Sequence, residues 1–433
     1  MKYASRLLTA AIKKLLIPRI LALSLCMLIS LSAFYIATIT SQQVPTEFVE
    51  DMSFLVPIVN YDKMNETNEA NHSMELDVPL HSLNTSGDSQ DESFSSCLLV
   101  MDENFRLYEW LSYHYHVLPL RYVVVAVDPR SNLSPEPVFD LFRNELSMTI
   151  ITWTDDDYIV VHENLPENAT GAQIMFQYLK RQCQFLSKCL QYMQEQGRTW
   201  VALWDVDEYI SINGNDRQIG NLTTPSDLFV PGTIYKYLQK MEPVVCHSMI
   251  RLEVGTKEIS EFHSLYNESA ALMNISISNL NPRQFDTLRY KYRNRNGGKI
   301  VGNGLGKVFL NVQNITFPWK VETPHRPVKH LCQGAYGVKY EKGPFLIYHY
   351  VGSWEAYSFR RSDARLHHRN WTTWKARSER SLHFIPKVNR WIEGFIMNVG
   401  KNRAFRLLQN AGLLNRTLSI VNVTHMAQKH NVK

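Results

Sequence analysis

The chain has 433 residues, long enough for one large domain or two of ordinary size. Hydrophobic residues make up 45% of it and aromatic residues 11%, which is ample for a packed core. The net charge of +5 is small and no run of basic residues is long, so we do not expect a nucleic-acid partner. The six cysteines form no Cys-x-x-Cys pair, so a zinc-knuckle site is not expected either.

The N-terminus predicts a membrane anchor. Ile20 to Thr40 is a stretch of 21 residues without a charge, close to the roughly 20 that cross a bilayer as a helix. Basic residues precede it, so the positive-inside rule places residues 1–19 in the cytosol and the rest across the membrane. A cleaved signal peptide is the alternative, but its apolar core is usually shorter and no small-x-small cleavage site follows Thr40. We therefore expect a single-pass type II protein.

Twelve Asn-x-Ser/Thr sequons all lie beyond this segment, which predicts that the body of the chain faces the secretory lumen. Five cysteines then meet an oxidising compartment, so at least one is unpaired or pairs between chains. Residues 41–95 are rich in Ser, Asn, Asp and Glu without a sustained period, and they predict a flexible glycosylated stem.

Strands and helices alternate in the first half of the body, which predicts an α/β fold with a mostly parallel sheet flanked by helices. Thr170-Gly-Ala-Gln173 fits a capping box ahead of a long helix. The elements expected, in chain order, are a strand at Cys97–Met101, a helix at Phe105–His116, a strand at Tyr122–Val127, a helix near Val138–Leu146, a strand near Met148–Trp153, the helix after Thr170 and a strand at Trp200–Trp204.

The long helix carries an apolar stripe that predicts core packing, formed by Met175, Leu179, Leu186, Leu190 and Met193. Cys183 and Cys189 lie on this helix about 9 Å apart along its axis, too far to bridge each other. After residue 210 the pattern loosens. There we expect strands at Met249–Val254, Lys307–Val312 and Phe345–Tyr350, and helices at Ile234–Met241 and Glu355–Trp374.

An acidic group, Asp205-Val206-Asp207-Glu208, follows the apolar run Trp200–Trp204. Three carboxylates at the end of a buried strand repel one another and are costly to desolvate, so a cation should compensate them. Ligands of open α/β sheets also bind at this edge. A divalent cation held by Asp205 and Asp207 answers both points and can neutralise a diphosphate. The alternative is a turn with solvated acids, which is our interpretation of Asp155–Asp157 after an earlier strand.

Four local patterns carry a family resemblance. They are Met101–His114, which contains Glu109-Trp110 and then His114; Gln173–Leu190, with Cys-Leu near its end; Trp200–Ile210, with Asp-x-Asp-Glu-Tyr; and Ile347–Tyr350, followed by Ser353 and Glu355. Over about residues 96–375 the chain resembles the GT-A glycosyltransferases and, within them, glycosyltransferase family 92.

The resemblance implies a GT-A fold in which Asp-x-Asp holds Mn²⁺, or Mg²⁺, against the diphosphate of a nucleotide-sugar, most plausibly a UDP-sugar. Asp207 would ligate the metal directly, and Asp205 would reach it through water or bind the ribose. A later histidine often supplies a third ligand in such enzymes. His325 is our first choice, and His349 is the second and a candidate contact to the donor. A neutral imidazole suits Mn²⁺ beside carboxylates.

The same resemblance suggests where the nucleotide would lie. Glu103, Glu109 and Asp128 stand at or near strand ends that would face the base and ribose. Glu109 is equally consistent with a cap or an ion pair on its own helix. The basic stretch from Arg283 to Lys307 predicts a solvated face, with contact to the diphosphate as the alternative and Lys307 as the candidate. The aromatic residues Trp354, Tyr357, Trp371 and Trp374 could stack on sugar rings, but their spacing favours core packing.

An inverting transferase, which the family is regarded as being, needs a carboxylate base. Glu258 and Glu261 follow the expected strand at Met249–Val254 and are our candidates, although Val254-Gly255 departs from the aromatic-Gly often seen in the family.

The anchor and sequons together with the resemblance imply a Golgi type II glycosyltransferase that moves a hexose, with galactose from UDP-galactose as the expected donor, onto a glycan. Its expected parts are a cytosolic tail (1–19), an anchor (20–40), a stem (41–95), a catalytic domain (96–400) and a C-terminal tail (401–433). The alternatives are a catalytically silent GT-A lectin or scaffold and a lumenal hydrolase with paired carboxylates. Homodimerisation is left open.

Overall fold

The computed structural model describes residues 93–159, 169–213, 227–241, 244–258, 280–294, 306–316, 320–321, 323–325, 327, 332, 343–359, 370–385, 388 and 390–414. The expected anchor and nearly all of the expected stem lie outside these residues. Within them, no helix combines the length and the apolar composition that crossing a bilayer requires.

The first half of the body is a parallel α/β unit, as the alternating pattern predicts. Its strands stand in the order β3-β2-β1-β4, and each neighbouring pair is parallel. The strands are β1 (Phe94–Val100), β2 (Leu120–Val127), β3 (Thr149–Trp153) and β4 (Trp200–Ala202). The helices are α2 (Asn104–Val117), α3 (Glu136–Leu146) and α4 (Gly171–Glu195), with a 3-10 turn η1 (Asp155–Asp157) after β3.

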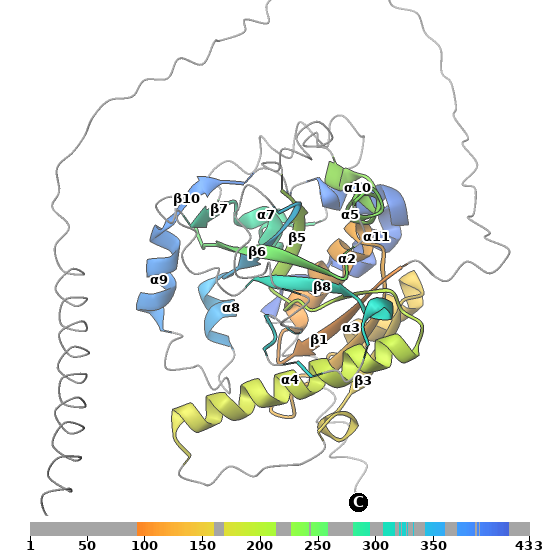
Figure 1. Cartoon of the computed structure of the whole chain (residues 1–433). Helices are drawn as coiled ribbons and strands as arrows, with labels where there is room; N and C mark the ends of the chain where they lie inside the picture. Colours follow the sequence, from red (N-terminus) through yellow and green to blue (C-terminus); the bar gives the residue numbers. More distant parts are fainter. Residues whose placement is uncertain are drawn as a thin grey trace, which may run out of the picture. The chain divides into compact units, whose positions relative to one another are not determined.

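Alternation along the strands divides the core between two faces of this sheet. Val123 and Val125 of β2 pack on the face that α2 covers, while Val124 and Ala126 pack on the face that α4 covers. Figure 1 shows α4 running along one side of the sheet and α2 on the other. The expected capping box forms, because the side chains of Thr170 and Gln173 each accept from the other's backbone N–H.

Only the C-terminal half of the expected stripe on α4 enters the core. Leu186, Leu190 and Met193 are buried, but Leu179 is 42% exposed, and the side chain of Met175 lies outside the description. Cys189 forms a disulfide with Cys97 of β1. Cys183 forms no disulfide, in agreement with the predicted odd cysteine.

The second half turns the sheet into a mixed one. Strand β8 (Lys307–Asn311) runs antiparallel between β4 and β6 (Cys246–Val254). Strand β9 (Phe345–Tyr350) pairs parallel with β6 and antiparallel with β5 (Glu208–Ile212), a strand that the sequence does not predict. Beyond β6 lie β7 (Tyr292–Asn294) and β10 (Ser381–Phe384), both paired antiparallel.

Helices of the second half surround these strands (Figure 1). Where one helix was expected over 355–374, the structure has two, on either side of residues 360–369, which are not described. The helices are α5 (Thr233–Leu238), α7 (Asp286–Arg289), α8 (Trp354–Phe359), α9 (Trp371–Glu379), α10 (Trp391–Val399) and α11 (Lys401–Leu408), with 3-10 turns at Asp227–Phe229, Pro282–Gln284 and Val312–Asn314.

The packed body extends past residue 400, where the sequence places its end. Ala404, Leu407 and Leu408 of α11 are buried in the core that α2 shares, as is Ala411 beyond the helix. Their apolar surface contributes about 25 cal/mol per Å² buried, so this segment stabilises the body.

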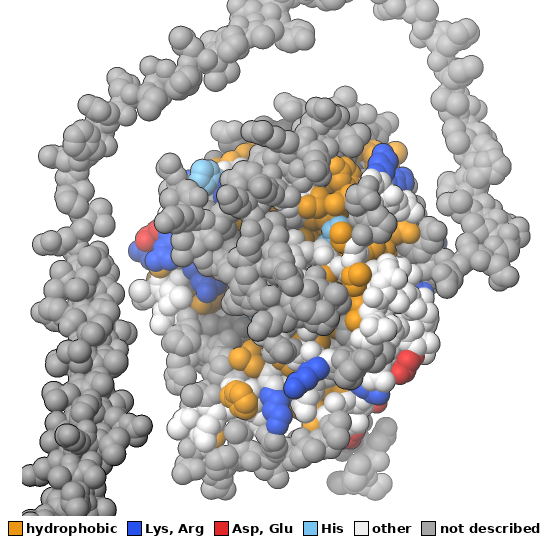
Figure 2. Space-filling model, viewed as in Figure 1, with side chains coloured by type: hydrophobic (Ala, Val, Ile, Leu, Met, Phe, Trp, Pro, Cys, Tyr) orange, Lys and Arg blue, Asp and Glu red, His pale blue; other side chains and the backbone are white. Residues whose placement is uncertain are grey.

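The surface agrees with the modest net charge. Among the described side chains on the face drawn in Figure 2, Lys and Arg stand in small separate groups.

The buried His114 makes folding sensitive to acid. Its Nδ1 lies 2.9 Å from the carbonyl of Trp110 and must donate there, which leaves Nε2 buried and unpaired among the described residues. Burial lowers the pKa of His114 to about 3, below the 6.5 of the unfolded chain. The unfolded state therefore binds more protons between pH 6.5 and 3.

As the pH is lowered through this window, we expect His114 to reduce the free energy of unfolding by up to about 1.4 kcal/mol per pH unit. Urea unfolding at several pH values measures it. His114→Gln should reduce the slope of the free energy of unfolding against pH by the amount that corresponds to about one bound proton. An unchanged slope would contradict this account.

Candidate active site

The acidic group forms a tight turn between β4 and β5. The N–H of Glu208 donates to the carbonyl of Asp205 (3.0 Å), and the N–H of Asp205 donates to Oε2 of Glu208 (2.9 Å). The Glu208 side chain is fully buried, and its other oxygen accepts from Nη1 of Arg251 at 3.2 Å. Glu208 therefore braces the turn and leaves the exposed positions to the two aspartates.

Asp205, Asp207 and Glu208 place carboxylate oxygens within 4.8 Å of one another. The ammonium of Lys307, at the start of β8, lies 2.9 Å from both Asp205 Oδ2 and Glu208 Oε2. Burial opposes a low pKa at Asp205, but Lys307 outweighs it and the net effect lowers the pKa. Lys307 thus supplies part of the positive charge that the acidic pattern requires.

The predicted ligand His325 lies beside Asp205. The two groups shift each other's pKa, and burial followed by the charge of Lys307 lowers the pKa of His325 to about 3. Its Nδ1 lies 3.2 Å from the carbonyl of Gly306 and so must donate to it. A neutral imidazole held in this way presents the lone pair of Nε2, the arrangement common among metal-bound histidines.

Asp207 has different partners from Asp205. Its Oδ2 lies 3.4 Å from Nη1 of Arg106 and 3.5 Å from Nε2 of His349. His349 stands on β9, paired with Glu208 across the antiparallel ladder, so its side chain is brought to the turn by strand register. Of the two predicted histidines, His349 therefore contacts Asp207 directly, whereas His325 acts on Asp205 electrostatically.

Arg106 holds this side of the site together from α2. Its guanidinium is 4% exposed and, besides Asp207, contacts Glu103 (3.5 Å) and Asp286 (3.1 Å). It also donates to the carbonyl of Val351 at 3.2 Å. Burial by itself lowers the pKa of Arg106, but these acids reverse the effect and raise it, so the group stays charged.

The charges leave a negative excess that suits a divalent cation. Five carboxylates, those of Glu103, Asp205, Asp207, Glu208 and Asp286, pair with the cations Arg106, Arg251 and Lys307. His349 also pairs with Asp207, and Arg289 acts on Asp286, so the acidic groups still outnumber the permanently charged cations around them. Carboxylate oxygens together with one imidazole nitrogen are a donor set that Mn²⁺ accepts. The residues fit a metal that Asp205 and Asp207 would hold, with His325, which interacts electrostatically with Asp205, as the predicted third ligand.

Asp286 is the residue that sequence reasoning missed. It begins α7, and its only side-chain hydrogen bond among the described residues joins Oδ2 to Arg106, which leaves Oδ1 available. Glu109 fixes this position, because its carboxylate accepts from the N–H groups of Asp286 (2.7 Å) and Thr287 (2.9 Å). The signal present in the sequence was a single acid within a basic stretch.

The expectation that Glu109 caps or pairs on its own helix is wrong, because it caps α7 instead. Burial and the nearby Asp286 raise the pKa of Glu109 to about 7.

The nucleotide-contact candidates of the first half are held by arginines. Asp128, after β2, accepts from Arg130 (2.8 Å) and Arg181 (2.7 Å). Burial works against it, but these hydrogen bonds and charges lower the pKa of Asp128. Arg181 also binds Asp155 at 2.5 Å, so that acid is paired and not simply solvated. Glu103 lies with Arg106 at the metal side of the site. Their contacts to a nucleotide stay a prediction.

The expectation of a solvated basic face is wrong at two positions. Lys291 and Lys307 are each 1% exposed. Lys307 neutralises acids, as above, and Lys291 donates to the carbonyl of Thr287. Burial lowers the pKa of Lys291 to about 7.

The two candidates for the base have different outcomes. Glu258 pairs with Arg289 at 2.5 Å and is bridged to Tyr290, and its side chain is 37% exposed. No described contact joins it to the acidic group. Glu261 lies outside the described residues.

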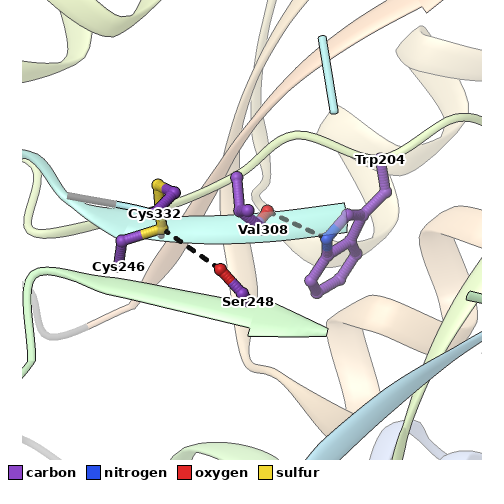
Figure 3. The surroundings of a disulfide bond; sticks show 5 residues. All are labelled: Trp204, Cys246, Ser248, Val308 and Cys332. Carbon is purple, nitrogen blue, oxygen red and sulfur yellow. Dashed lines mark hydrogen bonds between the residues drawn. A yellow bond between two sulfur atoms is a disulfide. The ribbon is translucent and has the colours of Figure 1, made fainter. Parts of the chain in front are cut away.

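A disulfide ties the histidine-bearing segment to the sheet. Cys332, seven residues after His325, is bonded to Cys246 at the start of β6. Figure 3 shows this bond beside β8, where the indole of Trp204 donates to the carbonyl of Val308 (3.1 Å). The link limits how far the segment carrying His325 can move from the turn.

No protein-family model and no curated protein matches the chain. Three solved structures that resemble it are glucosyl-3-phosphoglycerate synthase from Mycobacterium tuberculosis (11% identity, TM-score 0.23), core-mannan synthase A from Aspergillus fumigatus (11%, 0.25) and the mannosyltransferase Ktr4p from S. cerevisiae (9%, 0.26). They align with 52%, 52% and 57% of this chain and 58%, 61% and 62% of their own, so the chain spans about six tenths of each. At these scores the similarities do not bear on activity.

Gly352 tests whether Arg106 positions the site. This residue has φ +80°, and a Cβ there would lie 2.2 Å from Nη2 of Arg106. Gly352→Ala should displace the guanidinium, lower the free energy of unfolding by about 1–3 kcal/mol and weaken Mn²⁺ binding. Thermal unfolding and calorimetric titration with Mn²⁺ measure these two effects.

Gly400→Ala is the matched control. Gly400 has a similar φ of +86° but no atom within 4 Å of its Cβ position, so that variant carries the backbone strain without the clash. Equal Mn²⁺ affinity in the two variants would rule out a positioning role for Arg106.

Proposed function

We propose that this protein is a metal-dependent glycosyltransferase that transfers a hexose from a nucleoside-diphosphate sugar to a glycan acceptor in the secretory pathway. The observation that carries the proposal is the acidic turn, where Asp205, Asp207 and Glu208 place carboxylate oxygens within 4.8 Å of one another at a strand end and His349 contacts Asp207. Carboxylates repel a diphosphate, and a divalent cation bound there would remove that repulsion.

The residues divide the work of an inverting transfer. The acceptor hydroxyl oxygen attacks the anomeric carbon, the bond from that carbon to the diphosphate oxygen breaks, and the hydroxyl proton passes to a carboxylate. When bound, the metal would neutralise the departing diphosphate. Asp205 and Asp207, with His325 as the predicted third ligand, would hold it, while Arg106 and Lys307 fix the two aspartates.

We assign the base role to Asp286 ahead of Glu258. Asp286 shares Arg106 with Asp207, so it is next to the metal side of the site, and its Oδ1 is available. Glu258 is committed to Arg289.

The setting supports a lumenal location. Two disulfides form within the described residues, and disulfides persist mainly in oxidising compartments. Together with the uncharged segment Ile20–Thr40 and the sequons, they are the basis for proposing a Golgi type II membrane protein. The resemblance to family 92 suggests galactose from UDP-galactose as the first donor to test.

Nucleotide release tests the function directly. The full chain, produced in a secretory host and solubilised in detergent, should release UDP or GDP from at least one nucleotide-sugar when Mn²⁺ and glycan acceptors are present. Chelation with EDTA should abolish release, and Asp207→Asn should lower it at least roughly 100-fold, because the metal loses its direct ligand.

Asp155→Asn serves as the control, since Asp155 also follows a parallel strand of the sheet but pairs with Arg181 and has no described contact with the acidic turn. It should retain turnover within about threefold. Release of no nucleotide from any donor would refute the proposal, and full turnover by Asp207→Asn would refute the metal assignment.

Asp286→Asn and Glu258→Gln separate the two candidate bases. In the first variant the side-chain amide oxygen can still accept from Arg106, so the fold and Mn²⁺–UDP affinity should hold while transfer falls about 10²–10⁴-fold. Glu258→Gln should retain most of the rate. Single-turnover kinetics and calorimetry with UDP distinguish chemistry from binding, and the opposite pattern would assign the base to Glu258.

A further inference from the structure

Three tryptophans form an aromatic cluster on α8 and α9 that the core does not explain. The rings of Trp371 and Trp374 stack with centroids 4.8 Å apart, and Trp354 meets them edge-on at 5.2 and 6.0 Å. No residue of α9 is buried, and Trp371 is 51% exposed. The sequence spacing favoured core packing, and that expectation is wrong for Trp371. Leaving so large an apolar ring in water forgoes about 25 cal/mol per Å².

The cluster is joined to the acidic site through one residue. The indole N–H of Trp374 donates to the carbonyl of Gly352 (3.1 Å). Gly352 packs directly against Arg106, the guanidinium that holds Asp207. The aromatic surface therefore begins where β9 ends, next to the place where transfer would occur.

A second link brings polar groups to the same surface. Arg377 of α9 pairs with Glu253 at 3.4 Å, and Glu253 lies opposite His349 in the ladder of β6 and β9. Both side chains are partly exposed, at 34% and 27%, and Glu355 on α8 is exposed as well. α8 and α9 lie on one flank of the sheet in Figure 1.

An exposed flat indole with carboxylate and guanidinium groups nearby has the chemistry of a carbohydrate site. The C–H face of a pyranose ring is apolar and can cover an indole, while its hydroxyls need planar charged partners for hydrogen bonds. A protein or lipid partner of comparable affinity would need a larger continuous apolar surface than one exposed tryptophan offers.

We propose that Trp371, supported by Trp374 and Trp354, is the platform on which a pyranose ring of the acceptor glycan stacks. This inference rests on the proposed function, and it adds the location and chemistry of the acceptor subsite. The sugar that stacks is a unit of the acceptor and not the donor hexose, because the platform stands beyond Gly352 and not on the acidic turn.

The experiment uses the full chain in detergent with Trp371→Ala, Trp371→Phe and Phe176→Ala. Phe176 is a matched control, since it is an aromatic residue 70% exposed on α4 and makes no contact with the site among the described residues. Binding is measured on an array of neutral oligosaccharides without nucleotide, and kinetics with Mn²⁺, UDP-galactose and an array-positive oligosaccharide.

Trp371→Ala should lose about tenfold or more in glycan binding and raise the acceptor KM by a similar factor, with kcat at saturating acceptor nearly unchanged. Hydrolysis of UDP-galactose without acceptor should be unaltered. Trp371→Phe should recover most of the loss, and Phe176→Ala should match the wild type in every measurement.

The outcomes separate this inference from the function on which it rests. Nucleotide release with an acceptor KM that Trp371→Ala leaves unchanged would overturn the platform and keep the transferase. Glycan binding that depends on Trp371, without nucleotide release from any donor, would support the platform and leave a lectin. A dimer that Trp371→Ala converts to monomer, with glycan binding intact, would overturn the platform by assigning the surface to self-association.

Discussion

The site depends on one buried guanidinium. Arg106 contacts three carboxylates and a backbone carbonyl, and these partners belong to segments as far apart in the chain as Glu103, Asp286 and Val351. In a low-dielectric interior, removal of one partner from such a cluster costs about 3–5 kcal/mol, because the remaining charges lose their compensation. Arg106 thus makes the position of Asp207 a consequence of how α2, α7 and β9 pack together.

Helix α2 extends this control to the strand that follows the acidic turn. Trp110 and Tyr113 donate to the carbonyls of Glu208 (3.1 Å) and Ile210 (2.5 Å) in β5. Glu109 caps α7 on the same side. The Glu-Trp-His pattern that contributed to the family resemblance therefore helps to position β5 and α7 through hydrogen bonds. None of its described contacts requires direct participation in chemistry.

The sequence predicts what local periodicity and steric rules determine. Local patterns predict the parallel strands around β1, the capping box of α4 and the acidic turn after β4. The reason is that burial alternates with a period of two in strands and of about 3.6 in helices. Strand β5 could not be predicted in this way. Its pairing with β9 joins residues far apart in sequence, such as Ile210 and Ile347, and no local pattern encodes that pairing.

The same limit explains the errors in the site. Lys307 lies in a basic stretch whose composition predicts exposure to solvent. The pairing of β8 with β4 and β6 nevertheless buries Lys307 against Asp205. Asp286 is a lone acid in sequence and becomes a neighbour of Asp207 only through Arg106. Charged residues carry no periodic signal, so their partners are known only after the fold is known.

Asp205, Asp207 and Glu208 look equivalent in sequence, but their surroundings give them different roles. Glu208 is fully buried and accepts from Arg251, Lys307 and the Asp205 N–H, so its oxygens are already used. Asp205 is 41% exposed, and Asp207 is 13% exposed, with long contacts of 3.4 and 3.5 Å to Arg106 and His349. A cation entering from solvent would meet the two aspartates first and leave the glutamate's hydrogen bonds intact. The rigidity of the turn and its capacity for a metal therefore come from different residues, and both can be kept together.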